Sequence, residues 1–100
     1  MSLKGTQKRE LRAVGHHLNP VIYVAEQGLT EGLIKETERA LDDHELIKVK
    51  FAISDREARQ QLISQLSQDC RAEVIQVIGK MALLYRAAKK PNLKLSKVPR

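Results

Sequence analysis

The stretch "VIYVAEQGLTEGLIKETERALDDHELIKVK", residues 21–50, decides the fold. It starts with a run of strand-forming residues, 21–25, which we expect to form a short buried strand. A loop follows, and Thr30 then stands as an N-cap before a helix with one apolar face. A second strand-like run, 46–53, comes after that helix. Two strands joined by a helix run parallel, so this stretch predicts a β-α-β unit.

The second run, "LIKVKFAI" at 46–53, alternates in polarity from one residue to the next. Successive side chains in a strand point to opposite faces of the sheet. The alternation therefore predicts that one face of this strand is covered and that the other is open and carries lysines. The residues expected on the covered face are Ile47, Val49, Phe51 and Ile53, and those expected on the open face are Lys48, Lys50 and Ala52.

The flanking segments complete the domain. Residues 6–18 have the spacing of a basic amphipathic helix, and "SDRE" at 54–57 matches a capping box with Ser54 as the N-cap of a further helix. The runs 73–79 and 81–86 predict a hairpin with a tight turn at Gly79 and Lys80. The expected order is α-β-α-β-α-β-β in a single compact α/β domain. Its mixed four-stranded sheet should have most of its helices on one face.

Positive charge is concentrated at the two ends of the chain. The net charge is +6; residues 1–20 hold four basic residues and one acid, while residues 86–100 hold six basic residues and no acid. The segment between them holds eleven acids and eight basic residues. Basic ends bind polyanions by neutralising phosphates, or they serve only as solubilising tails. Two basic ends on one small domain favour nucleic acid. We expect residues 89–100 to be a basic tail that is ordered only in part.

The sequence offers little for catalysis or for a metal or other cofactor. His16 and His17 are adjacent, so on a helix they diverge by about 100° and do not share a metal ion. His44 stands alone, and Cys70 falls on the apolar stripe of a helix, as a small core residue does. We therefore expect a protein that is not an enzyme and has no cofactor. The chain shows no membrane span and no secretory signal, so we expect a cytoplasmic protein that does not bind membranes.

Few aromatic residues are available for stacking on nucleic-acid bases. The chain has Tyr23, Phe51 and Tyr85, and Phe51 is expected on the covered face of its strand. A stacking platform of the kind found on RNA-recognition sheets is therefore not expected. Recognition would depend on phosphate contacts and on shape, which favours structured RNA.

Two segments carry a family resemblance: "VAEQGLTEGLIKETERALDDHELIKVK" at 24–50 and "VIGKMALLYR" at 77–86. They resemble the bacterial YhbY-like proteins, the stand-alone form of the CRM domain (chloroplast RNA splicing and ribosome maturation). The resemblance covers about residues 3–90, and we take residues 1–88 as the CRM-like domain. It implies an RNA-binding fold similar to the C-terminal domain of a bacterial translation initiation factor. It also implies binding to precursor large-subunit ribosomal RNA in pre-ribosomal particles, and we expect the protein to be a monomer.

The expected RNA contacts combine this resemblance with the basic residues. They are Lys4, Lys8, Arg9, Arg12, Gln27, Gly28, Thr30, Lys48, Lys50, Gly79, Lys80 and Arg86. Each lysine has the alternative role of keeping a surface soluble. The family loop typically has the pattern G-x-x-G, but here Ala25 replaces the first glycine and Glu26 adds a negative charge. We therefore expect Ala25→Gly or Glu26→Lys to strengthen RNA binding. The alternative function is an adaptor that docks on a ribosomal protein or a GTPase through the acidic helix expected after Thr30.

Overall fold

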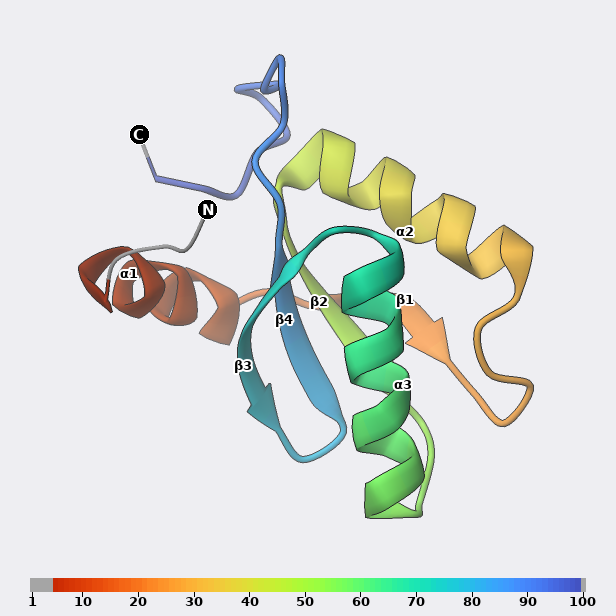
Figure 1. Cartoon of the computed structure of the whole chain (residues 1–100). Coiled ribbons are helices and arrows are strands. Elements are labelled where there is room, and N and C mark those ends of the chain that lie inside the picture. The colour runs from red at the N-terminus through yellow and green to blue at the C-terminus, as the bar shows by residue number, and fades with distance from the viewer. Residues whose placement is uncertain (1–4, 100) are drawn as a thin grey trace.

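The computed structural model describes residues 5–99, and its elements follow the expected order (Figure 1). They are α1 (Gly5–His16), β1 (Pro20–Val24), α2 (Glu31–His44), β2 (Leu46–Phe51), α3 (Arg56–Asp69), β3 (Glu73–Ile78) and β4 (Met81–Tyr85). No helix in this part of the chain is both long and apolar enough to cross a membrane.

The four strands form one mixed sheet in the order β1-β2-β4-β3. β1 runs parallel to β2, and β4 pairs antiparallel with both β2 and β3. The predicted mixed sheet is confirmed, but the prediction that residues 21–25 form a buried strand is wrong. β1 is an edge strand in which Ile22 and Val24 are buried, whereas Val21 and Tyr23 are exposed. A run of five apolar residues does not reveal whether its strand lies at the centre or at the edge of a sheet.

The larger core lies between one face of the sheet and the helices α2 and α3 (Figure 1). Val49 and Phe51 of β2 are fully buried there, together with Leu41 of α2 and Leu66 of α3. The alternation of β2 therefore has the predicted direction. Cys70, at the end of α3, is also buried in this core, as expected of a small core residue.

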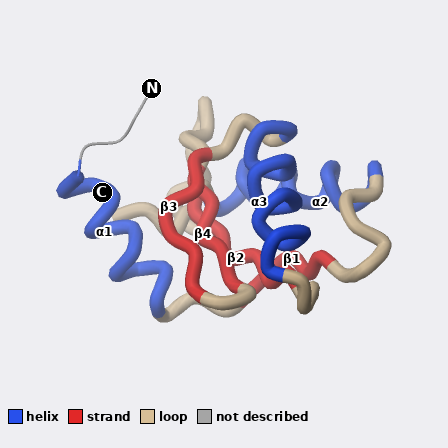
Figure 2. Tube along the Cα trace, turned by 60° about the horizontal axis from the view of Figure 1, so that its bottom comes forward, coloured by secondary structure: helices blue, strands red, loops and turns tan. Residues whose placement is uncertain are grey.

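A smaller core lies on the second face of the sheet, between the strands and α1. Leu11 of α1 packs there with Leu46, Ile75 and Leu83. The strands thus separate α1 from α2 and α3 (Figure 2). Gly15 lies close to the sheet, because a Cβ atom at this position would overlap the side chain of Leu83. Most of the helical cover lies on the other face, as predicted.

The two predicted helix caps have different outcomes. Thr30 caps α2 as expected, because its Oγ1 accepts a hydrogen bond of 3.1 Å from the backbone N–H of Leu33. The prediction of a cap at Ser54 is wrong. Asp55 is the N-cap of α3, and its side chain makes no capping hydrogen bond. The guanidinium of Arg59 instead donates to the carbonyl oxygens of Ile53 and Ser54, which fixes the turn before the helix.

The C-terminal residues 87–99 contain neither helix nor strand, yet several hydrogen bonds attach them to the domain. The carboxylate of Glu45 accepts hydrogen bonds from the backbone N–H of Ala88 and from the hydroxyl of Ser96, each at 2.8 Å. Glu45 is 2% exposed and has φ of 63°. A buried carboxylate therefore holds both ends of this segment close to the junction of α2 and β2.

Candidate nucleic-acid interface

The second face of the sheet is covered only in part. α1 packs over the half formed by β3 and β4 and over Leu46, and this leaves the half formed by β1 and the rest of β2 open. Val21 and Tyr23 of β1 project from this open half with 45% and 60% of their surface exposed. Lys48 and Lys50 of β2 lie on the same face and are half-buried. We call the face formed by Val21, Tyr23, Lys48 and Lys50 the open sheet face.

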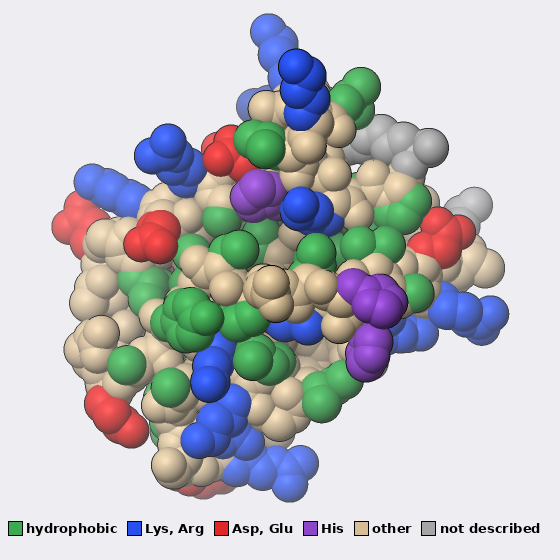
Figure 3. Space-filling model, turned by 180° about the vertical axis from the view of Figure 1, so that it is seen from behind, with side chains coloured by type: hydrophobic (Ala, Val, Ile, Leu, Met, Phe, Trp, Pro, Cys, Tyr) green, Lys and Arg blue, Asp and Glu red, His purple; other side chains and the backbone are tan. Residues whose placement is uncertain are grey.

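The pairing of β1 with β2 brings an aromatic ring beside the lysines. Tyr23 is opposite Lys50 in the register, and Pro20 is opposite Lys48. From behind, this side of the molecule shows hydrophobic, basic and histidine side chains intermixed (Figure 3). An exposed ring beside two ammonium groups suits a nucleic acid, because the ring stacks on a base and the cations contact phosphates. The open, lysine-bearing face predicted for β2 is present.

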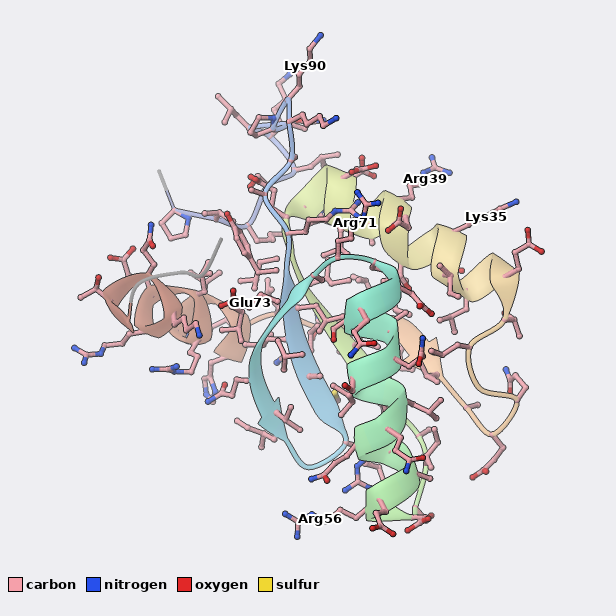
Figure 4. The ribbon with its side chains drawn as sticks, viewed as in Figure 1. Lys35, Arg39, Arg56, Arg71, Glu73 and Lys90 are labelled. Atoms are coloured by element: carbon pink, nitrogen blue, oxygen red, sulfur yellow. The ribbon has the colours of Figure 1, made fainter. Side chains whose placement is uncertain are left out.

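Further basic groups lie at the end of the sheet where β1 and β2 stop. The hairpin turn at Gly79 and Lys80 lies next to β2, since the carbonyl of Lys80 accepts a 2.7 Å hydrogen bond from the N–H of Phe51. Gly79 has φ of 57°, a conformation that glycine adopts without strain. Arg56, at the start of α3, points away from the domain at this end (Figure 4) and lines a hollow together with Gly79. Lys80 and Arg56 therefore extend the positive surface beyond the open sheet face.

The loop between β1 and α2 begins one residue after Val24, so it adjoins the open sheet face along the chain. It turns tightly, with a 2.9 Å hydrogen bond from the N–H of Gly28 to the carbonyl of Ala25. Gly28 has φ of 75°, so a glycine is required there. Ala25, by contrast, is not among the residues with positive φ. A glycine at position 25 is thus not needed for the backbone conformation of this turn, and a gain from Ala25→Gly would have to come from closer approach of the RNA once the methyl group is removed. Gln27 and Thr30 are exposed beside Gly28.

The basic residues of α1 lie elsewhere. Lys8 forms an ion pair of 3.2 Å with Glu73 of β3, whose side chain is directed toward α1 (Figure 4). β3 is the edge strand opposite to β1, so this end of α1 is remote from the open sheet face. Arg9 is exposed and Arg12 is half-buried on the same helix. Lys4 lies outside the described residues. The predicted contacts therefore divide into a group around β1 and β2 and a separate group on α1.

Arg86 has a structural role that differs from the predicted RNA contact. Its guanidinium donates to the carboxylates of Glu38 at 2.7 Å and Asp42 at 2.9 Å, and to the backbone carbonyls of Cys70 and Glu38. Its side chain is only 20% exposed. Burial alone would lower the pKa of Arg86, but the hydrogen bonds and charges of the two carboxylates raise it above its ordinary value. Arg86 joins β4 to α2 and the end of α3, so we omit it from the interface.

The buried thiol of Cys70 has no role in this interface. Burial, followed by the charge of the nearby Glu38, raises the pKa of the Cys70 thiol from 9.0 to about 11. The thiol therefore stays protonated and unreactive near neutral pH. Among residues 5–99, no cluster of three or more His, Cys, Asp or Glu side chains has the arrangement of a metal site.

Tyr23 and Arg56 were missed from the sequence. Tyr23 was expected inside a buried strand, and only the position of β1 at the sheet edge exposes it. The polar end of a tyrosine, which favours a partly wet position, was the available signal. Arg56 belongs to the predicted capping-box segment 54–57, and nothing local in the sequence indicates that the hairpin turn lies beside it.

Comparisons with known proteins agree on one family. The model of the CRS1/YhbY (CRM) domain matches residues 3–86. A Pseudomonas aeruginosa protein named as a probable RNA-binding protein is 52% identical over 100 residues, which cover this whole chain and 96% of the relative. An RNA-binding protein of Haemophilus influenzae is 43% identical, with 94% of this chain and 95% of the relative covered. The solution structure of a Staphylococcus aureus protein, for which RNA binding has been suggested, superposes with a TM-score of 0.78 at 35% identity. That superposition covers 98% of this chain and all of the other.

Proposed function

We propose, because this chain belongs to the CRS1/YhbY (CRM) domain family, that it is a non-catalytic RNA-binding protein. The names of its relatives support RNA as the partner. The observation that carries the proposal is the open sheet face, where Tyr23 lies beside Lys48 and Lys50 on the half of the sheet that α1 leaves uncovered. Lys80, Arg56 and the loop around Gly28 extend the contact surface at one end of the sheet.

We further propose that the RNA is a precursor of large-subunit ribosomal RNA, bound in the cytoplasm by a monomer during assembly of pre-ribosomal particles. The resemblance of residues 24–50 and 77–86 to the bacterial stand-alone CRM proteins supports this finer role. The surface chemistry agrees with it, because lysines and a single exposed ring suit the phosphates and unpaired bases of a folded RNA.

The adaptor alternative has a weaker basis. It depends on the acidic residues of α2, but Glu38 and Asp42 of that helix already bind Arg86. Glu31 forms an exposed ion pair with Lys35, one turn along the same helix. Much of the negative charge of α2 is thus compensated within the chain, which leaves less of it to attract a basic partner.

Salt-dependent binding to a labelled fragment of large-subunit ribosomal RNA tests the proposed surface. Replacing Lys48 and Lys50 together by alanine should lower affinity and reduce the slope of log affinity against log salt by about two, because each lost phosphate contact removes about one. The matched control replaces Lys35 and Arg39, which extend from the outer side of α2 (Figure 4), and should leave the slope unchanged. Equal losses in both double variants would show that the attraction depends only on total charge and would refute the surface.

Crosslinking in cell extracts tests the assembly role. We expect the protein to sediment with precursors of the large subunit and to crosslink to their RNA, with crosslinks lost in the Lys48 and Lys50 double variant. Crosslinks confined to a ribosomal protein or a GTPase would favour the adaptor. Crosslinks to RNAs unrelated to the ribosome would retain RNA binding and reject the assembly role.

A further inference from the structure

A hollow of about 330 Å³ lies on the second face of the sheet, next to the open sheet face. Leu18 and Asn19 of the α1–β1 connection, Val21 of β1 and Lys48 of β2 line it on one side, and His44 and Lys97 line it on another. Its volume is at the lower end of the range of about 300–1,000 Å³ found for small-molecule sites. The expected RNA contacts do not include His17, His44 or Lys97, so most of its polar lining has no assigned role.

The lining combines an apolar wall with basic groups. Leu18 and Val21 provide the apolar side, and Lys48 and Lys97 provide two ammonium groups, with the imidazoles of His17 and His44 nearby. None of the described residues that line the hollow is Asp or Glu. An apolar wall suits a base, an exposed amide such as that of Asn19 suits a base edge, and ammonium groups suit a phosphate. This combination fits a nucleotide better than an uncharged or a positively charged ligand.

The C-terminal segment is held so that it contributes to this hollow. The N–H of Lys97 donates to the carbonyl of His44 at 2.9 Å, and His44 Nδ1 lies 2.9 Å from the carbonyl of Leu95 and donates to it. The hydroxyl of Ser96, between them, binds the buried carboxylate of Glu45. These three contacts fix consecutive residues of the segment against the α2–β2 junction. The backbone of Lys97 is therefore held beside the hollow that this residue lines, whereas Lys94, three residues earlier, does not line it.

We propose that this hollow binds one nucleotide of a single-stranded part of the RNA, and that residues 95–97 form part of the binding site. The base lies against Leu18 and Val21, and its phosphate contacts Lys48 and Lys97. Because Tyr23 follows Val21 by two residues on the same face of β1, the neighbouring base reaches the exposed ring of Tyr23. The inference rests on the proposed function and adds to it a pocket for an unstacked nucleotide and a role for the C-terminal segment.

Adenosine 5′-monophosphate, inorganic phosphate and adenosine serve as probes, and ¹H–¹⁵N chemical shifts of the full-length protein provide the measurement. We expect the monophosphate to move the amide signals of Val21, Lys48 and Lys97. Adenosine and inorganic phosphate should each bind at the same place more weakly. Lys97→Ala should weaken monophosphate binding about three- to tenfold, because one hydrogen bond from a solvent-exposed side chain is lost. Lys94→Ala, the matched control in the same segment, should leave it unchanged.

Equal losses of monophosphate affinity in Lys94→Ala and Lys97→Ala would overturn the inference. So would signal changes centred on residues away from the hollow. So would the absence of any saturable shift with the monophosphate. RNA binding measured in parallel separates the two proposals. If the unmodified protein binds ribosomal RNA with steep salt dependence but the monophosphate does not enter the hollow, only the pocket is rejected. If the monophosphate binds in the hollow but the RNA does not bind, the proposed function is rejected and the pocket belongs to a free nucleotide.

Discussion

The two faces of the sheet are covered unequally, although both carry large side chains. On one face, α2 and α3 bury Val49 and Phe51 completely. On the other face, α1 covers only the half near β3, and Val21 and Tyr23 of β1 stay exposed. Residues on the first face contribute to stability because they are removed from water. Those on the open sheet face contribute little to it and remain available to a ligand. The contrast separates residues that hold the domain together from residues that bind.

The largest expected effect is on the covered face. Phe51→Ala should lower the free energy of unfolding by about 3–5 kcal/mol, because it leaves a cavity where a fully buried ring packs. Val21, on the open sheet face of the neighbouring β1, is 45% exposed. Val21→Ala should therefore lower the free energy of unfolding by less than about 1 kcal/mol. Denaturant unfolding monitored by circular dichroism measures both values. Similar losses in the two variants would contradict the division between a dry face and an open one.

Arg86 tests whether a basic residue belongs to the structure or to the interface. Arg86→Met should lower the free energy of unfolding by about 1–3 kcal/mol, since it leaves the carboxylate of Glu38 and the carbonyl of Cys70 without their donor. The exposed Arg39 is the control, and Arg39→Ala should change stability by less than about 0.5 kcal/mol. The salt slope of RNA binding should be the same for Arg86→Met as for the unmodified protein. A slope reduced by about one would return Arg86 to the interface.

Tyr23 tests the open face without affecting the core. Tyr23→Ala should weaken binding to single-stranded RNA by about 1–3 kcal/mol, the range measured for the loss of a stacked aromatic ring. The free energy of unfolding should change by less than about 1 kcal/mol, because the side chain of Tyr23 is 60% exposed on an edge strand. Tyr23→Phe keeps the ring and should bind as the unmodified protein does. Fluorescence anisotropy with a short labelled RNA gives the affinities. A loss of the same size in Tyr23→Phe would assign the effect to the hydroxyl and would exclude stacking.

The smallest expected effect is in the loop that continues β1. Glu26 is exposed two residues before Gly28. Glu26→Lys should raise the salt slope of RNA binding by up to about one, because a cation replaces an anion beside the proposed contact. Glu36→Lys, at an exposed position of α2, makes the same change in net charge and should alter the slope less. Equal slopes for the two variants would place the loop outside the interface.

Local patterns in the sequence predicted most of the fold. The Thr30 cap, the alternation of 46–53 and the turn at Gly79 each depend on residues close together in the chain. The edge position of β1 was not predictable in this way, because it follows from the strand order β1-β2-β4-β3. The cap of α3 was misplaced by one residue, since the turn before it is held by Arg59 from within the helix and not by Ser54.

The candidate site was less predictable than the fold for the same physical reason. Arg86 begins a basic run and resembles its neighbours in sequence, but its partners Glu38 and Asp42 come from a helix 48 and 44 residues earlier. Charge counted along the chain does not distinguish a neutralised guanidinium from a free one. Lys48 and Lys50 were predicted correctly as residues of an open face because alternation within one strand determines the face of a side chain. Whether they contact RNA remains a prediction.

Gly15 lies where α1 packs on the side chain of Leu83 of β4. A methyl group added at this position would overlap Leu83, so either the leucine or the helix would have to move. The packing of α1 on the sheet therefore depends on a small residue at position 15. Among relatives of this chain, the residues at positions 15 and 83 should therefore vary as a pair, with a larger residue at one accompanied by a smaller residue at the other. In evolutionary terms, a packing contact beside the proposed binding surface constrains that surface, because Leu83 pairs with Lys48 and Gly15 comes just before the lining residues His17 and Leu18.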